Sequence, residues 1–196
     1  MANSHFRFKQ FTVHQEHASF RITTDSVLLG AWAELQGVRR ILDIGTGTGI
    51  LALMAAQRSD AYIVAIEPDR NSFMQAGLNI ASSPWHDRIS LISTSAQEYL
   101  SGDGLLFDTV ITNPPFFNDS LLNPDPWKAS TRHSITLSHR ELLESSLRLM
   151  SPGGTLQTVL PVNEAATFMD MASAAGLSCS RRLIVKPTPL LPPARI

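Results

Sequence analysis

The stretch DIGTGTG, residues 43–49, joins an apolar segment to a run that is rich in Ala, Leu and Met. Residues 40–44 before it predict a buried strand, and residues 50–58 after it predict a helix. Glycine at alternate positions permits positive φ angles and lets a ligand approach the backbone. The first N–H groups of the following helix have no partner within that helix. The stretch therefore predicts a strand, turn and helix unit that holds a small polar ligand.

The spacing of these glycines differs from that of the dinucleotide-binding turn. G-x-G-x-x-G seats a pyrophosphate on a helix dipole, whereas here the glycines alternate and Asp43 precedes them. A carboxylate beside the turn repels a phosphate and favours a cation. Glu67 ends the next predicted strand, residues 62–66, where it can accept hydrogen bonds from both hydroxyls of a ribose. The pattern favours a ligand with an ammonium group and a ribose over NAD; the alternative is a generic glycine-rich turn followed by an exposed Glu.

This combination resembles the class I S-adenosylmethionine-dependent methyltransferases, in which an acid-x-G-x-G-x-G turn holds the methionine part of the cofactor. The resemblance implies that S-adenosyl-L-methionine is the cofactor and that its ribose lies on the acid after the second strand. It further implies that residues after the third strand line the adenine pocket, where many relatives carry an acid and this chain has Ser95-Ala96-Gln97. Ala96 and Gln97 are therefore expected in the cofactor site, with ordinary loop residues as the alternative. The expected cofactor-binding residues from these segments are Asp43, Gly45, Gly47, Gly49, Glu67, Ala96 and Gln97.

Strand and helix patterns alternate along the chain. Further strands are predicted at residues 89–93, 107–111, 155–160 and 179–185, and further helices at residues 70–81, 139–149 and 163–175. Because parallel neighbours need crossover connections, this alternation predicts an α/β fold, a Rossmann-like class I methyltransferase with a mostly parallel, doubly wound sheet. The sequence looks cut short at Ile196, where a further strand is expected to start.

The N-terminal part precedes this alternation. Six apolar residues among polar ones predict a small hairpin with one buried face: Phe6, Phe8, Phe11, Val13, Phe20 and Ile22. Thr23, Thr24 and Asp25 offer capping side chains for an apolar helix over residues 26–32. The expected organisation is one domain over residues 1–196, with the hairpin and helix at about 6–35 and the catalytic core at about 38–187.

Composition excludes several classes of protein. With 196 residues and 43% hydrophobic content the chain can bury one core, and a formal net charge of -1 provides no global attraction to nucleic acid or membrane. A single cysteine, Cys179, excludes an internal disulfide, and no segment has the pattern of a signal peptide or membrane span. The six histidines lack a tight ligand spacing, so no metal is expected. We expect a soluble, cytoplasmic protein, and a monomer is favoured.

The stretch TNPPFFN, residues 112–118, follows the predicted strand at 107–111. In the methyltransferase topology this place faces the methyl group of the cofactor. An amino group attached to an aromatic ring or a carbonyl is a poor nucleophile because its lone pair is delocalised. Two acceptors on its N–H groups, the side-chain oxygen of Asn113 and the carbonyl of Pro114, would favour a tetrahedral nitrogen, and the prolines would keep them rigid. Asn113, Pro114 and Phe116 are the expected catalytic residues, and Asn113 also faces the cofactor.

The aromatic residues of this stretch point to a flat substrate. Phe116 is expected to stack on a flipped base, and Phe117 either helps or belongs to the core. The stretch resembles the N-P-P-aromatic motif of enzymes that methylate adenine N6 or a glutamine side-chain amide, and enzymes that methylate cytosine N4 have the related S-P-P form. The glutamine enzymes resemble it with Tyr at the place of Phe116. This difference favours a base, and a strand-ending turn with core aromatics is the alternative.

The resemblance extends to residues 8–11 (FKQF), 24–32 (TDSVLLGAW) and 128–133 (KASTRH), from near Phe6 to about Lys186. These stretches look like the bacterial tRNA adenine-N6 methyltransferases, which modify adenosine 37 beside the anticodon of a valine tRNA. The resemblance implies a tRNA substrate and places Thr24 and Asp25 near the methionine end of the cofactor; a helix N-cap is the alternative for both.

Contacts to the RNA backbone are expected from basic residues. Lys128, Arg132 and His133 in the segment 118–138, an expected lid or RNA-contacting loop, are the first candidates for substrate binding. Arg7, Lys9, Arg181, Arg182 and Lys186 are further candidates. Three other functions stay open: glutamine methylation of a translation release factor, DNA adenine methylation, and a non-catalytic RNA-binding module.

Overall fold

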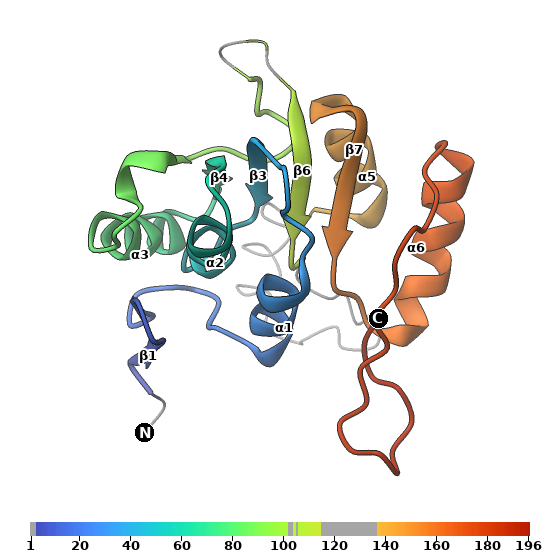
Figure 1. Ribbon diagram of the computed structural model, residues 1–196, viewed down its shortest axis with the longest axis horizontal. Helices are drawn as coiled ribbons and strands as arrows, with labels where there is room; N and C mark the ends of the chain where they lie inside the picture. Colours follow the sequence, from blue (N-terminus) through green and yellow to red (C-terminus); the bar gives the residue numbers. More distant parts are fainter. Residues whose placement is uncertain (1–2, 102–103, 105, 115–136) are drawn as a thin grey trace, which may run out of the picture.

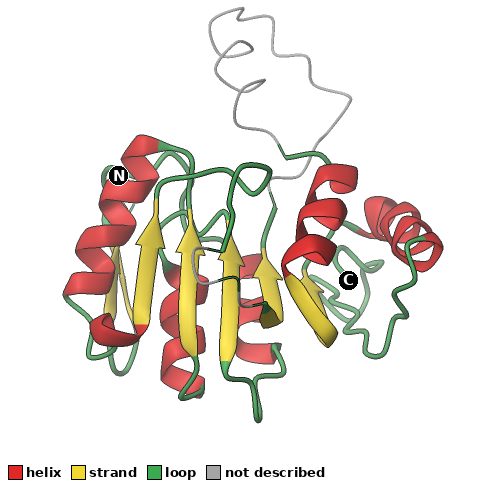
Figure 2. Cartoon of the chain, turned by 90° about the horizontal axis from the view of Figure 1, so that it is seen from above, coloured by secondary structure: helices red, strands yellow, loops and turns green. Residues whose placement is uncertain are grey.

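The computed structural model describes residues 3–101, 104, 106–114 and 137–196. A five-stranded sheet forms the centre of the molecule (Figure 1), and its strands are β3 (Arg40–Ile44), β4 (Tyr62–Ile66), β5 (Ile89–Ile92), β6 (Phe107–Thr112) and β7 (Met150–Thr158). Their order is β5-β4-β3-β6-β7, and each neighbouring pair is parallel. The predicted α/β fold with a mostly parallel sheet is confirmed. Figure 2 shows the strands side by side with helices packed around them.

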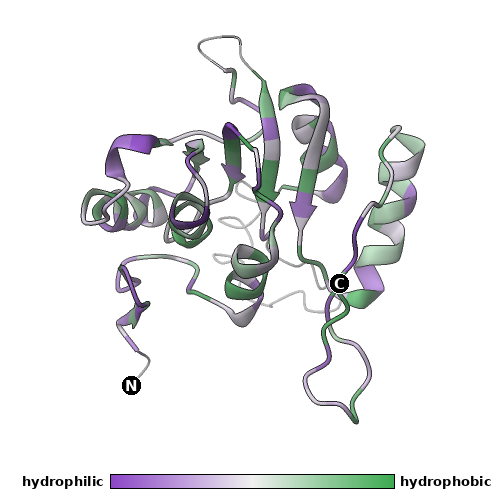
Figure 3. Ribbon diagram, in the orientation of Figure 1, coloured by the Kyte–Doolittle hydropathy of each residue, from purple (hydrophilic) through white to green (hydrophobic). Residues whose placement is uncertain are grey.

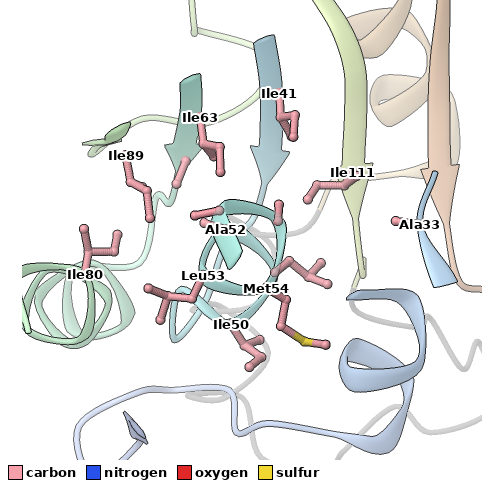
Figure 4. Close-up of a cluster of buried hydrophobic side chains, with 14 of the residues drawn as sticks. Ala33, Ile41, Ile50, Ala52, Leu53, Met54, Ile63, Ile80, Ile89 and Ile111 are labelled. Carbon is pink, nitrogen blue, oxygen red and sulfur yellow. The ribbon is translucent and has the colours of Figure 1, made fainter. Parts of the chain in front are cut away.

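Helices cover both faces of this sheet, because each buried strand carries apolar residues on both of its sides. One cluster joins Ile41, Ile63 and Ile111 to α1 (Thr24–Trp32), α2 (Ile50–Arg58) and α3 (Arg70–Ala81). Figure 4 shows Ala52 of α2 on the side of the strands, near Ile63, and Leu53 on the side of Ile80 of α3. The other cluster joins the alternate strand positions to α5 (His139–Leu149) and α6 (Val162–Ala174). In Figure 3 hydrophobic residues, drawn green, are prominent in β6 and α1, whereas β7 is mostly pale.

A glycine sets the distance between α1 and α2. A Cβ atom on Gly30 would lie 2.5 Å from Sδ of Met54, so an alanine there would require the Met54 side chain to shift. Arg58 adds a hydrogen bond from its guanidinium to the carbonyl oxygen of Gly30 (2.8 Å). Helix α1 is thereby packed on α2.

The predicted N-terminal hairpin is present as β1 (His5–Arg7) and β2 (Thr12–His14), which pair antiparallel. Asn79 of α3 holds it, accepting from the N–H of His14 (2.9 Å) and donating to its carbonyl (2.8 Å). Phe11 and Val13 are buried, but Phe6 and Phe20 are 46% and 53% exposed. Only part of the predicted apolar face is therefore buried.

The C-terminal part differs from the prediction. Residues 179–185 form no strand, and within the described chain only Val185 makes an isolated bridge, to Arg195. The end of the chain instead pairs with the residues that follow β7, where the backbone groups of Ile196 and Leu160 exchange two hydrogen bonds (2.8 and 2.9 Å). Strand β7 begins at Met150, earlier than predicted, and its register with β6 jumps between Phe107 and Thr109. Residues 151–154, which precede the predicted strand at 155–160, form this irregularity in the ladder.

In the part of the chain that the structure describes, no helix is both long and apolar enough to cross a membrane.

Candidate active site

Three strands of the sheet end at the same level. Ile44 of β3 is in register with Ile66 of β4 and with Thr112 of β6. Thr112 also donates from its hydroxyl to the carbonyl oxygen of Ile44 (2.9 Å). The residues that follow these strands, Gly45, Glu67 and Asn113, therefore emerge together at the carboxyl edge of the sheet, where parallel α/β folds bind ligands.

The glycine turn leaves open space at this edge. Gly45, Gly47 and Gly49 have φ angles of 68°, 59° and 84°, which only glycine adopts without strain. A Cβ atom on Gly45 or Gly47 would have no neighbour within 4 Å, so a ligand can approach the backbone there. Gly49 differs from the other two glycines, because it is the N-cap of α2 and its backbone packs against Ala76 of α3.

Asp43 lies beneath the turn and is completely buried. Its Oδ2 accepts hydrogen bonds from the hydroxyl of Thr46 (2.5 Å) and the N–H of Ala52 (3.0 Å). Burial raises the pKa of Asp43 to about 7, although these two hydrogen bonds oppose the rise. Its other oxygen, Oδ1, has no hydrogen-bond partner among the described residues. Asp43 thus braces the turn, and a cation above the turn would stabilise its charged form.

Glu67 closes the other side of the turn. Its Oε2 accepts from the N–H of Gly47 (2.8 Å), and its Oε1 accepts from the N–H of Asp69 (2.9 Å). Burial raises the pKa of Glu67, and these two backbone donors oppose the rise. Each carboxylate oxygen keeps a second lone-pair site, so the predicted contacts to two ribose hydroxyls remain possible alongside the backbone contacts.

The segment after β5 contains Ala96, which is buried, and Gln97, which is exposed. One guanidinium nitrogen of Arg148, on α5, donates to the carbonyl oxygens of Ala96 (2.8 Å), Gln97 (3.1 Å) and Tyr99 (3.3 Å). The side chain of Gln97 also hydrogen-bonds Glu141 at the start of α5. Arg148 therefore fixes the backbone of the predicted adenine pocket, a role that the sequence pattern did not indicate.

Asn113 and the buried Pro114 follow β6 at the same edge. The side-chain nitrogen of Asn113 donates to Oγ1 of Thr23 at 3.5 Å. Its side-chain oxygen is buried and has no hydrogen-bond partner in the described part of the chain. A buried acceptor without a partner costs about 1–3 kcal/mol, so a donor supplied by a ligand would be favourable at this place.

The start of α1 lies against this asparagine. The N-cap of α1 is Thr23, and Thr24 and Asp25 form its first turn. Oδ2 of Asp25 accepts from Nε of Arg195 (2.8 Å), so this carboxylate is already paired with a cation from the C-terminal segment. Nothing in the structure tests whether Thr24 or Asp25 contacts a cofactor, and that role stays a prediction.

Several predicted site residues lie outside the described residues. They are Phe116, Phe117, Lys128, Arg132 and His133, together with most of the expected loop at 118–138. Of the further basic candidates, Arg181 pairs with Glu34 (2.9 Å) and lies over the ring of Trp32 (4.7 Å to its centroid). Among the described residues, no group of three or more His, Cys, Asp and Glu side chains could hold a metal ion. The expected absence of a metal therefore stays a prediction.

The residues at this edge fit the predicted cofactor. The turn offers backbone with no neighbouring side chain, where the methionine part would lie, and Asp43 has an oxygen without a partner beneath it. Glu67 follows the neighbouring strand, and its carboxylate lies directly beside the turn, where it could accept from ribose hydroxyls. These observations agree with S-adenosyl-L-methionine and with its sulfonium and ammonium charges.

Comparison with known proteins agrees with this geometry. The family model of the methyltransferase small domain matches residues 17–174. The tRNA1(Val) (adenine(37)-N6)-methyltransferase of Parabacteroides distasonis is 44% identical over 196 residues, which covers 100% of this chain and 83% of that protein. The protein of the same name from Dyadobacter fermentans is 46% identical over 182 residues, which covers 92% of this chain and 75% of that protein.

A solved structure with low sequence identity shares the fold. The crystal structure of TYW2 from P. horikoshii in complex with MeSAdo superposes with a TM-score of 0.60. The two chains are 16% identical, and the match covers 88% of this chain and 60% of that chain. At this level of identity the likeness concerns the fold alone.

Proposed function

Because this chain belongs to the methyltransferase small domain family, we propose that it methylates the N6 amino group of an adenine in tRNA, at adenosine 37 beside the anticodon of a valine tRNA. S-adenosyl-L-methionine supplies an electrophilic methyl group on a sulfonium centre. The names of the two relatives support this substrate. The single observation that carries the proposal is the buried side-chain oxygen of Asn113, an acceptor without a partner beside the glycine turn.

The chemistry of this substrate matches an acceptor at that place. The exocyclic nitrogen of adenine shares its lone pair with the ring, so it must become more tetrahedral before it attacks a methyl group. Asn113 Oδ1 and the carbonyl oxygen of Pro114 accept its two N–H groups and favour that geometry. Proline fixes its own φ angle and restricts the residue before it, so both acceptors are held in place. The nitrogen loses its extra proton to solvent after the transfer, and no base is needed before it.

A target beside an anticodon suits this site. Unpaired loop bases can be splayed out at little cost and stacked on aromatic rings. Phe116 and Phe117 are the proposed stacking residues, and Lys128, Arg132 and His133 are the proposed phosphate contacts, all of them outside the described residues. A tRNA substrate also favours the cytoplasm as the place of action.

The test is methyl transfer from labelled S-adenosyl-L-methionine to unmodified tRNA, followed by nucleoside analysis. The wild-type protein is expected to produce N6-methyladenosine in a valine tRNA. Asn113→Ala should lower the rate by about 10²–10³, the usual loss when one group that stabilises a transition state is removed, while cofactor binding is kept. Asn163→Ala, an exposed asparagine on α6, is the matched control and should keep the wild-type rate.

Two outcomes would contradict the proposal. If Asn113→Ala keeps the wild-type rate, the amide does not hold the reacting nitrogen. If label enters a release factor and none enters tRNA, the acceptor serves a glutamine side-chain amide, which is the second chemistry that an Asn-Pro-Pro site supports.

A further inference from the structure

In the side-chain amide of Asn113, the nitrogen has a hydrogen-bond partner, whereas the oxygen has none among the described residues. Its nitrogen meets Oγ1 of Thr23 at 3.5 Å, across 90 residues of sequence. Its oxygen is buried and has no hydrogen-bond partner among the described residues. We propose that Thr23 is a positioning residue: it holds the nitrogen end of the Asn113 amide and so turns the oxygen end toward the amino group of the substrate. This inference rests on the proposed function, in which that oxygen accepts an N–H of the substrate.

Orientation matters because an amide reversed by 180° would present the wrong group. In that arrangement the two N–H donors of Asn113 would face an amino group that also donates. The terminal torsion of an asparagine side chain is broad and roughly two-fold, so rotamer preference alone does not decide between the two arrangements. A fixed partner on the nitrogen end reduces the time that the amide spends in the reversed or intermediate positions. The contact is long without substrate, as catalytic hydrogen bonds commonly are.

Thr23 is itself held in place, which a positioning residue requires. It is the N-cap of α1, with φ of -115° and ψ of 161°. Its Oγ1 accepts from the N–H of Ser26 (3.3 Å), while the hydroxyl of Ser26 donates to the carbonyl oxygen of Thr23 (2.8 Å) and accepts from its N–H (3.2 Å). A hydroxyl oxygen has two lone-pair sites, so Oγ1 can accept from both Ser26 and Asn113.

The helix that carries Thr23 is anchored at its ends. Arg195 binds Asp25 in the first turn (2.8 Å), and Arg181 binds Glu34 just after the last turn (2.9 Å). Between them, Gly30 lets α1 pack against Met54 of α2. The position of Oγ1 of Thr23 is therefore set by the core of the protein, and not by a free loop.

A helix cap alone is the simpler explanation for Thr23, and variants can separate the two roles. Thr23→Val keeps the shape of the side chain and removes the hydroxyl, so both the cap and the contact to Asn113 are lost. Thr23→Ser keeps the hydroxyl. Ser26→Ala removes the two hydrogen bonds of the Ser26 hydroxyl and weakens the same helix start, but leaves Oγ1 of Thr23 in place. Ser26→Ala is therefore the matched control for loss of capping.

Steady-state methyl transfer to the valine tRNA is measured together with the dissociation constant of the cofactor. Thr23→Val should lower kcat about tenfold, in the range of one lost positioning contact, with the cofactor dissociation constant within about twofold of the wild-type value. Thr23→Ser should restore kcat to within about twofold. Ser26→Ala should lower the melting temperature by a few degrees, as Thr23→Val does, and keep the wild-type kcat.

A double variant shows whether Thr23 acts through Asn113. In the Asn113→Ala background, Thr23→Val should cause no further loss of kcat, because the group that it positions is absent. The inference is overturned if Thr23→Val keeps the wild-type kcat, if Ser26→Ala loses as much, or if the two losses multiply in the double variant.

A readout without turnover separates this inference from the proposed function. The side-chain amide of Asn113 can be assigned in ¹⁵N NMR spectra by its absence from Asn113→Ala. In the cofactor-bound protein, Thr23→Val should shift and broaden that amide signal, and Ser26→Ala should leave it unchanged. If the wild type fails to methylate tRNA but the signal responds in this way, the proposed substrate is wrong and the positioning contact stands. If the signal is unchanged in Thr23→Val, the positioning contact is wrong whatever the substrate.

Discussion

Replacing Gly45 with alanine tests whether the glycine turn is shaped for a ligand or only for the chain. Gly45 has a φ angle of 68°, and a Cβ atom there would meet nothing within 4 Å. Gly37, in the loop before β3 at the opposite edge of the sheet, has a φ angle of 73° and equally open surroundings. Gly45→Ala and Gly37→Ala are therefore matched in backbone strain and in the absence of clashes, and differ only in their place.

The expected loss of stability is the same for both variants. A residue with a Cβ atom in the left-handed region costs about 1–2 kcal/mol, and the stiffer unfolded chain returns about 0.4–1 kcal/mol. The free energy of unfolding should fall by about 1 kcal/mol, which lowers the melting temperature of a domain of this size by about 2–4 °C. Thermal melts followed by circular dichroism measure this directly.

Cofactor binding should separate the two variants. In Gly45→Ala the added methyl group fills the space in which the methionine part would meet the backbone, so the dissociation constant of S-adenosyl-L-methionine should rise at least about tenfold, or about 1.4 kcal/mol. In Gly37→Ala it should stay at the wild-type value, as isothermal titration calorimetry can show. Wild-type affinity in Gly45→Ala, or an equal loss in both variants, would refute the assignment of this surface to the cofactor.

Two further predictions concern groups beside the turn. Burial raises the pKa of Asp43 from 3.8 to about 7, so between these pH values the folded protein keeps a proton on Asp43 that the unfolded chain has released. The free energy of unfolding should therefore fall as the pH rises from about 4 to 7, and the contribution of Asp43 should be constant above pH 7. A cationic cofactor favours the carboxylate, so its affinity should rise with pH below about 7, by at most about tenfold per pH unit for this group. Calorimetry on Asp43→Asn should show a weaker pH dependence, because only Glu67, whose pKa is also raised by burial, remains to titrate beside the turn. Equal profiles for the wild type and Asp43→Asn would exclude this coupling. Arg148→Met removes the donor that three backbone carbonyl groups share, so it should lower the free energy of unfolding by about 2 kcal/mol and weaken cofactor binding several-fold. Arg140 is exposed on the same helix, and Arg140→Met should have neither effect. Equal melting temperatures for both variants would show that Arg148 does not hold the adenine pocket.

The regular elements around the turn could be predicted because local pattern and burial agree there. The limits of α2, β4 and α3 match the predicted residues 50–58, 62–66 and 70–81. Each of these elements is bounded by a strong local signal, such as the capping side chain of Asp69 before α3. The strand expected at residues 179–185 is absent because a strand needs a neighbour with which to pair, and its apolar residues alone do not supply one.

Only those residues of the candidate site that directly follow a strand could be predicted from the sequence. Gly45, Glu67 and Asn113 each follow a strand, so the parallel sheet brings them together without any further information. Thr23 and Arg148 reach the site from helices, and their partners lie 90 and about 50 residues away in sequence. No local pattern encodes such a contact, and in the sequence alone Thr23 is a possible helix cap and Arg148 a surface charge.

Both ion pairs of α1 involve arginines near the C-terminal end of the sequence, so they can form only late in synthesis. Asp25 and Arg195 are separated by 170 residues, and Glu34 and Arg181 by 147. A ribosome that adds about 5–20 residues per second needs on the order of ten seconds or more to make the second member of each pair. Until then the helix can pack on α2 but lacks both ion pairs. Nascent chains that stall before residue 181 should therefore contain the glycine turn and a first helix that packs on α2 without ion pairs at its ends, and limited proteolysis of ribosome-bound chains would show whether those ends fray.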